Sequence, residues 1–240
     1  MLKTLSFCIT SYDRDYHLLD RLWSSLLYQS VAPDEIIVVS SGMPADRLKQ
    51  DTSCVIANNE VPVYQVHSTK RLPICDARNL GASVSSGEIT QFFDGDDVLH
   101  RDHINVTRRA FSESPSLEVL VHCYIRSLMG VSPEMLTPHN FSLSNLKNIV
   151  WSSSTDHIAM EDSKFGTTAD GPVAIVTELL DKIKYRRYCP GYQDREMLRH
   201  LINTEKANVK GYDFPLMNYF PANETGRAKL GARDPLPYQT

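Results

Sequence analysis

Strands and helices alternate along the first hundred residues, and this alternation restricts the fold more than any other feature of the sequence. Short runs of apolar, mostly β-branched and aromatic residues mark the strands, and leucines at intervals of three and four mark the first helix. Strand, helix and strand in succession are typical of a parallel sheet, because parallel neighbours need a crossover between them. We therefore predict an α/β fold with a mostly parallel central sheet and helices on both faces. The expected elements of this part are strands at 5–10, 35–39, 62–66 and 88–93 and helices at 16–29 and 76–86.

The pattern is looser after residue 100, and it contains no internal repeat or linker. One domain is therefore the simplest division, with residues 1–99 and 100–210 as its two halves. Residues 211–240 contain four prolines and are predicted to form an irregular tail. The expected elements of the second half are helices at 100–112, 178–183 and 193–203 and strands at 117–123 and 171–176.

Composition and charge exclude several classes of protein. The chain has 240 residues, of which 42% are hydrophobic and 22% charged, so it can bury a core without disulfides. Its 29 acidic and 25 basic side chains leave it without the basic excess that nucleic-acid binding requires. Its five cysteines are an odd number without a Cys-x-x-Cys pair, which favours a cytoplasmic protein. No apolar run approaches the length of a transmembrane segment, about 18 residues or more.

Three carboxylates stand within four residues at the end of the strand predicted at 88–93: the order is Asp94, Gly95, Asp96 and Asp97. Ligands of open α/β sheets bind at the carboxyl ends of the strands. Carboxylates this close repel one another unless a cation neutralises them, and hard oxygen ligands favour Mg²⁺ or Mn²⁺. The alternative is a solvated turn in which Asp96 or Asp97 caps the following helix.

Two further groups of residues can carry chemistry. Arg78 lies near the start of the helix predicted at 76–86, where it could pair with a phosphate or with an acidic-turn carboxylate. An ordinary helix-start ion pair is the alternative. Asp194 opens the helix predicted at 193–203, and, taken alone, its position favours a helix cap.

Four segments occur in the order typical of family 2 of the inverting nucleotide-sugar glycosyltransferases, which the chain resembles over most of residues 4–202. Residues 5–14 and 35–42 are similar to that family's first two strands and the turns after them. Residues 77–97 contain its Arg-Asn-x-Gly helix and Asp-x-Asp strand end, and 171–201 resembles the segment that ends in its Glu-Asp pair. The resemblance implies a GT-A fold, which is related to the Rossmann fold. It also implies transfer of a hexosyl or deoxyhexosyl group from a nucleotide-diphosphate sugar to a hydroxyl of a glycan or other acceptor, with inversion.

Carried over residue by residue, the resemblance implies roles for individual side chains. Asp194 would be the catalytic base, and Asp96 together with Asp94 would hold Mn²⁺ or Mg²⁺. A metal stabilises a leaving diphosphate without a proton donor, so a single carboxylate base suffices, whereas hydrolases need two. The nucleotide-sugar site would be lined by Thr10, Tyr12, Asp13, Ser40, Arg78, Asp94 and Gly95.

The sequence departs from the family pattern at two places. Ser40 and Ser41 stand where the family usually has an acidic residue, so the resemblance does not imply uridine selectivity. Gln193 replaces the glutamate of the Glu-Asp pair but leaves Asp194 in place. Acceptor selectivity is expected in residues 130–168, which include His157, and in the tail.

Two other functions remain as alternatives. A nucleotidyltransferase would also need carboxylates after a strand, but it would need a glycine-rich basic loop after the first strand, and residues 10–14 contain no glycine. A catalytically silent sugar-binding module is the second alternative, because a fold does not fix a function.

Overall fold

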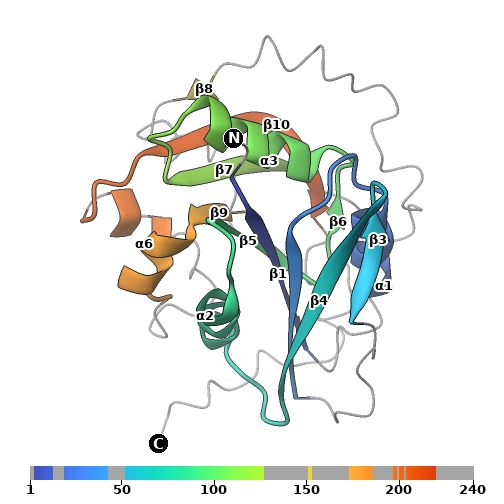
Figure 1. Cartoon of the computed structure of the whole chain (residues 1–240). Coiled ribbons are helices and arrows are strands. Elements are labelled where there is room, and N and C mark those ends of the chain that lie inside the picture. The colour runs from blue at the N-terminus through green and yellow to red at the C-terminus, as the bar shows by residue number, and fades with distance from the viewer. Residues whose placement is uncertain are drawn as a thin grey trace, which may run out of the picture.

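A computed structural model of the chain describes residues 3–12, 19–42, 52–126, 151–152, 173–185, 197–198, 200–202 and 204–219 (Figure 1). Among the described helices, none is long and apolar enough to cross a membrane. The described elements are β1 (Leu5–Tyr12), α1 (Leu19–Leu27), β2 (Glu35–Ser41), β3 (Ser53–Ile56), β4 (Asn59–Ser68), α2 (Ile74–Val84), β5 (Ile89–Asp94), β6 (Val98–Leu99), α3 (His103–Glu113), β7 (Val119–Arg126), β8 (Trp151–Ser152), β9 (Val173–Val176), α6 (Thr177–Lys182) and β10 (Val209–Tyr219).

One sheet contains the strands in the order β3-β4-β2-β1-β5-β9-β7-β10-β6, with β8 paired to β10. The four strands β4, β2, β1 and β5 run parallel, which confirms the α/β fold predicted from the first hundred residues. The second half of the sheet is mixed, because β9 lies antiparallel between β5 and β7 while β7 and β10 are parallel. The parallel half therefore brings the carboxyl ends of β1, β2 and β5 to the same edge.

Helices cover both faces of this sheet, as predicted. Alternate residues of β1 point to opposite faces, so Phe7 packs in one apolar cluster with α1 and α3, and Cys8 packs in a second cluster with α2 and α6. Figure 1 shows α2 and α6 on the other side of β1 from α1. Leu22 and Leu26 of α1 are completely buried, which explains the helical spacing of the leucines in this segment.

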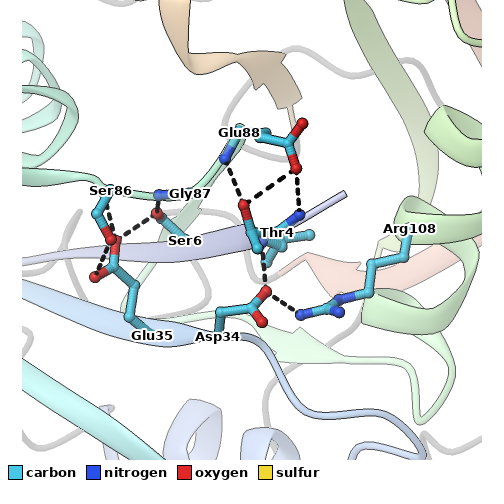
Figure 2. A network of polar contacts seen from close by, with 9 residues as sticks. Thr4, Ser6, Asp34, Glu35, Ser86, Gly87, Glu88 and Arg108 are labelled. Carbon is cyan, nitrogen blue, oxygen red and sulfur yellow. Dashed lines mark hydrogen bonds and ion pairs between the residues drawn. The ribbon is translucent and has the colours of Figure 1, made fainter. Parts of the chain in front are cut away.

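The amino-terminal edge of the sheet is held by a buried carboxylate (Figure 2). Glu35 at the start of β2 accepts hydrogen bonds from Ser6 Oγ at 2.5 Å, Ser86 N at 2.6 Å and Ser86 Oγ at 2.9 Å. Gly87 N donates in turn to Ser6 Oγ at 2.8 Å. This network joins β1, β2 and the turn before β5 at the edge opposite to the acidic turn.

The prediction of an irregular tail at 211–240 is wrong for residues 211–219, because these residues belong to β10. This strand pairs with β7 from Val209 to Tyr219 and with β6 at Met217 and Asn218. Pro215 lies at a shift in the β7 register, where a missing N–H is tolerated. The proline therefore interrupts the ladder without ending the strand, and residues 220–240 lie outside the described part.

A second difference from the prediction is the hairpin that β3 and β4 form. The sequence pattern predicts only one strand in this region, at 62–66. Its turn residues Ala57 and Asn58 have positive φ angles of 48° and 63°. Such angles suit a tight two-residue hairpin, but the turn lacks the glycine that usually identifies one in a sequence.

Candidate functional site

The acidic turn lies at the carboxyl edge of the parallel strands, against the end of β1. Thr10 and Asp94 are register partners on β1 and β5, and Gly95 N donates a hydrogen bond to Thr10 O at 3.0 Å. A Cβ atom at Gly95 would lie 3.2 Å from that oxygen and 3.4 Å from the Ser11 side chain. The lack of a side chain at Gly95 therefore allows the turn to lie directly on β1.

Asp94 is the point where β1, β5 and α2 meet. Its Oδ1 atom accepts hydrogen bonds from Thr10 Oγ1 at 3.0 Å and Arg78 Nη2 at 3.1 Å. The Arg78 side chain is 2% exposed and that of Asp94 is 21% exposed. The ion pair fixes the orientation of Asp94, whose side chain remains partly exposed. Of the two partners considered for Arg78, a phosphate and an acidic-turn carboxylate, the structure shows the carboxylate.

Tyr185, the third residue after the end of α6, covers the buried guanidinium of Arg78, with 5.5 Å between the ring centroid and the Arg78 Cζ atom. The neighbouring Asn79 holds the main chain of Tyr185 by two hydrogen bonds, from Nδ2 to the carbonyl oxygen at 2.9 Å and from the amide to Oδ1 at 2.8 Å. Phe92 supports the ring from β5 in an edge-to-face contact. Nothing in the sequence around Tyr185 indicates this role, although its partner Asn79 stands next to Arg78 in the Arg-Asn-x-Gly motif.

Asp94, Asp96 and Asp97 form a compact set of oxygen ligands. One carboxylate oxygen of each residue lies within 4.8 Å of the others, and Asp96 and Asp97 are 3% and 1% exposed. Because α3 begins only at His103, neither of these two aspartates occupies its N-cap. The interpretation of the turn as a solvated helix cap is therefore wrong. The three carboxylates fit a hard divalent cation.

Arg21 of α1 lies next to this turn and was not identified from the sequence. Its Nη2 atom donates a hydrogen bond to the carbonyl oxygen of Asp96 at 3.0 Å. Burial lowers the pKa of Arg21, while the negative charges of Asp96 and Asp97 oppose that shift. Two guanidinium groups, of Arg78 and Arg21, therefore balance part of the negative charge of the three aspartates.

Buried hydroxyl groups lie beside the turn at the ends of β1 and β2. Ser11 and Ser40 are register partners, 3% and 1% exposed, and Ser41 is buried beside them. Within the described residues, their hydroxyl oxygens have no hydrogen-bond partner. An unsatisfied buried hydroxyl costs about 1–3 kcal/mol, so these groups are suited to contact a polar ligand at this edge.

The structure gathers most of the residues predicted for nucleotide-sugar and metal binding. Tyr12 ends β1, and its ring contacts the Arg71 guanidinium, with 5.1 Å between its centroid and Cζ. The predicted residues Asp13 and Asp194, together with Gln193 and His157, lie outside the described residues. The residues brought to the carboxyl edges of β1, β2 and β5 are Thr10, Tyr12, Ser40, Arg78, Asp94, Gly95 and Asp96.

Comparisons with known proteins agree with this arrangement. The model of a family described as glycosyl transferase family 2 matches residues 6–187. No curated protein matches the sequence.

Similar solved structures include residues 1–349 of S. aureus TarS, with 16% identity, a TM-score of 0.60 and coverage of 93% of this chain and 62% of that one. The complex of the same TarS segment with UDP-GlcNAc has 16% identity, a TM-score of 0.60 and coverage of 91% and 58%. A mycobacterial protein has 17% identity, a TM-score of 0.58 and coverage of 93% and 70%. The chain thus spans about three fifths of this TarS segment, and the likeness shows a shared fold.

Proposed function

The chain belongs to glycosyl transferase family 2, and from this membership we propose that it transfers a sugar from a nucleotide-diphosphate sugar to an acceptor hydroxyl, with inversion. The observation that carries the proposal is the acidic turn at the carboxyl edge of the sheet, where Asp94 is fixed by Arg78 and Thr10. That edge is where α/β sheets bind ligands. The UDP-GlcNAc complex of TarS, which has the same fold, supports a nucleotide sugar as the donor class.

The donor's nucleoside is proposed to lie over the ends of β1 and β2. Asp94 is oriented for a hydrogen bond to the ribose, because Arg78 and Thr10 both hold its Oδ1 atom. The buried hydroxyls of Ser11 and Ser40 are suited to the polar atoms of the nucleoside. Tyr12 and Asp13 complete the proposed pocket. Because Ser40 and Ser41 stand where the family usually has an acidic residue, the selectivity for the nucleotide base has to be measured.

Asp96, with Asp94, is proposed to hold Mg²⁺ or Mn²⁺. The set contains only carboxylate oxygens and is largely buried, which suits a hard divalent cation. When bound, such a cation supplies positive charge that stabilises the leaving diphosphate without a proton donor.

Asp194 is proposed as the catalytic base. The acceptor oxygen attacks the anomeric carbon from the face opposite the diphosphate, the bond from that carbon to the diphosphate oxygen breaks, and Asp194 takes the hydroxyl proton. One attack on the opposite face inverts the configuration, and one carboxylate is enough for it. A glycan or other hydroxyl-bearing acceptor, a hexosyl or deoxyhexosyl group and a cytoplasmic location belong to the same proposal.

A thermal-shift panel of nucleoside diphosphates and nucleotide sugars, with and without Mn²⁺, tests the donor site. A ligand at about 100 times its Kd stabilises the fold by roughly 2.7 kcal/mol, so the matching nucleotide should raise the melting temperature measurably. We expect Asp96→Asn to lose the Mn²⁺-dependent part of this rise. The variant Asp194→Asn should keep it while turnover falls about 10²- to 10⁴-fold.

Other results would contradict parts of the proposal. A lack of any nucleotide-dependent shift would favour a silent binding module, and release of pyrophosphate from a nucleoside triphosphate and a sugar phosphate would identify a nucleotidyltransferase. Full turnover in Asp194→Asn would remove that residue as the base but leave the donor site in place.

A further inference from the structure

Arg21 and Ser25 of α1, and Gln29 two residues after the end of that helix, are polar residues spaced four apart. We call these three residues the stripe. Each of them bonds main-chain atoms of residues 96–104, which we call the turn segment. We propose that these residues are positioning residues, which fix the acidic turn in the geometry that binds the divalent cation. This inference rests on the proposed metal site and assigns α1 a role in it.

The first two contacts hold the turn segment at Asp96 and at Leu99. Arg21 Nη2 donates to the carbonyl oxygen of Asp96 at 3.0 Å, and Leu99 N donates to Ser25 Oγ at 3.0 Å. The Ser25 hydroxyl donates its own proton to the carbonyl oxygen of Leu22 at 2.7 Å. That bond orients the hydroxyl, so that a lone pair faces Leu99 N.

Gln29 makes the last two contacts with a single buried amide. Its Nε2 atom donates to the carbonyl oxygen of His100 at 2.7 Å, and its Oε1 atom accepts from Ile104 N at 3.1 Å. The side chain is 3% exposed, so water does not compete for these bonds. The amide therefore joins His100 to the first turn of α3.

Support from α1 matters because the carboxylates cannot fix the turn themselves. Asp94, Asp96 and Asp97 repel one another, and Arg78 forms an ion pair with Asp94. On its other side, the turn segment pairs with β10 at Val98 and Leu99. The stripe bonds main-chain atoms, so it fixes the backbone that carries Asp96 whether or not a cation is bound.

The helix provides a rigid base for this support. Leu22 and Leu26 are completely buried in the core between α1 and the sheet, and they lie on the helix next to the residues of the stripe. Groups that orient metal ligands typically contribute about 10- to 100-fold to metal affinity. We expect losses in this range when a bond of the stripe is removed.

Two neighbouring serines of α1 allow a matched test. Ser25→Ala removes the acceptor of Leu99 N, whereas Ser24→Ala removes a hydroxyl that bonds the carbonyl oxygen of Asp20 in its own helix. Mn²⁺ binding to the full chain, without nucleotide, is followed by the electron paramagnetic resonance signal of free Mn²⁺. We expect the Kd of Ser25→Ala to rise about 10- to 100-fold with one site per molecule retained, and that of Ser24→Ala to stay at the wild-type value.

The number of sites separates positioning from a general loss of structure. Partial unfolding lowers the number of sites per molecule and leaves the Kd of the folded molecules unchanged. A second variant, Gln29→Leu, should also raise the Kd, and circular dichroism at the assay temperature gives its folded fraction. If Ser25→Ala and Gln29→Leu both retain the wild-type Kd, the inference is overturned while the metal site stands. If the wild-type chain binds no Mn²⁺, the metal site and the inference both fall.

Discussion

Among the described residues, Arg78 is the largest side chain that is almost completely buried, and a charge in that position is stable only if it is paired. Asp94 provides the pair at 3.1 Å, and Tyr185 covers the guanidinium from the other side. The three side chains come from α2, β5 and the residues after α6. These contacts around one ion pair therefore join three parts of the chain at the edge of the sheet that carries the acidic turn.

The variant Arg78→Met should lower the free energy of unfolding by about 2–3 kcal/mol, because it leaves the partly buried carboxylate of Asp94 without its cationic partner. Arg109→Met is the matched control, since Arg109 pairs with Glu113 in an exposed contact between side chains that are 42% and 53% exposed. That pair should contribute about 0.5 kcal/mol or less. Urea unfolding with EDTA present measures both, and equal losses would contradict the role given to burial.

His100 makes the free energy of unfolding depend on pH. Burial lowers the pKa of His100 from its ordinary value of 6.5, against the opposing charge of Asp102, and its Nδ1 atom accepts a hydrogen bond from Asp102 N at 3.1 Å. The unfolded chain therefore binds this proton more readily than the folded one. The contribution of His100 to the free energy of unfolding is present above the pKa that His100 has in the unfolded chain. It is lost as the pH falls toward the lower pKa that His100 has in the folded protein.

Replacement by asparagine tests this dependence, because His100→Asn keeps an acceptor near the position of Nδ1 and does not titrate. The free energy of unfolding in urea should fall less in His100→Asn than in the wild type between about pH 7.5 and pH 5.5. Parallel curves for the two proteins would show that His100 does not carry the effect.

The close approach of α2 to the sheet depends on Gly81. A Cβ atom there would lie 2.1 Å from Cys8 Sγ and 3.3 Å from Val39 Cγ2. Burial raises the pKa of the Cys8 thiol to about 12, so this thiol is protonated at neutral pH and acts as an apolar packing group. The glycine of the Arg-Asn-x-Gly motif thus sets the distance between the helix that carries Arg78 and the strand that carries Thr10.

Gly81→Ala should destabilise the fold by about 1–3 kcal/mol, because the new methyl group overlaps a sulfur atom that has no room to move. In the double variant with Cys8→Ala the sulfur is absent, and the nearest remaining atom of residue 8 is its Cβ at 3.7 Å. The two losses should therefore sum to more than the loss in the double variant. Strict additivity in thermal unfolding would show that the contact does not limit the packing of α2.

The elements that sequence patterns predict best are those with strong periodicity. β1, β2, β5, α1 and α2 follow from alternation or helical spacing, because each buries one or both faces against the core. β3 has only one buried residue out of four, and β6 has two residues, so neither carries a recognisable pattern. β10 was missed because Pro215 favours a break, whereas the sheet accommodates it at a shift in register.

At the scale of the whole molecule, the sequence predicts those site residues whose side-chain type and position in a motif indicate their chemistry. Asp94, Asp96 and Arg78 stand in ordered motifs, and the parallel sheet brings them together as expected. Residue type does not reveal Arg21, Gln29 and Tyr185, because Arg21 and Gln29 bond main-chain atoms and Tyr185 contacts a guanidinium, all far away in the sequence. Such contacts depend on the packing of α1 and α6 against the sheet, which residue type alone does not specify.

The position of β10 in the sheet has a consequence for how the protein forms during translation. Residues 209–219 pair with β6 and β7, which leave the ribosome long before them. Until then the inner edges of β6 and β7 are unpaired, and exposed strand edges invite association with other chains. β6 belongs to the segment after the acidic turn, so the framework around Asp96 and Asp97 is completed by a strand that is synthesised long after the aspartates themselves emerge.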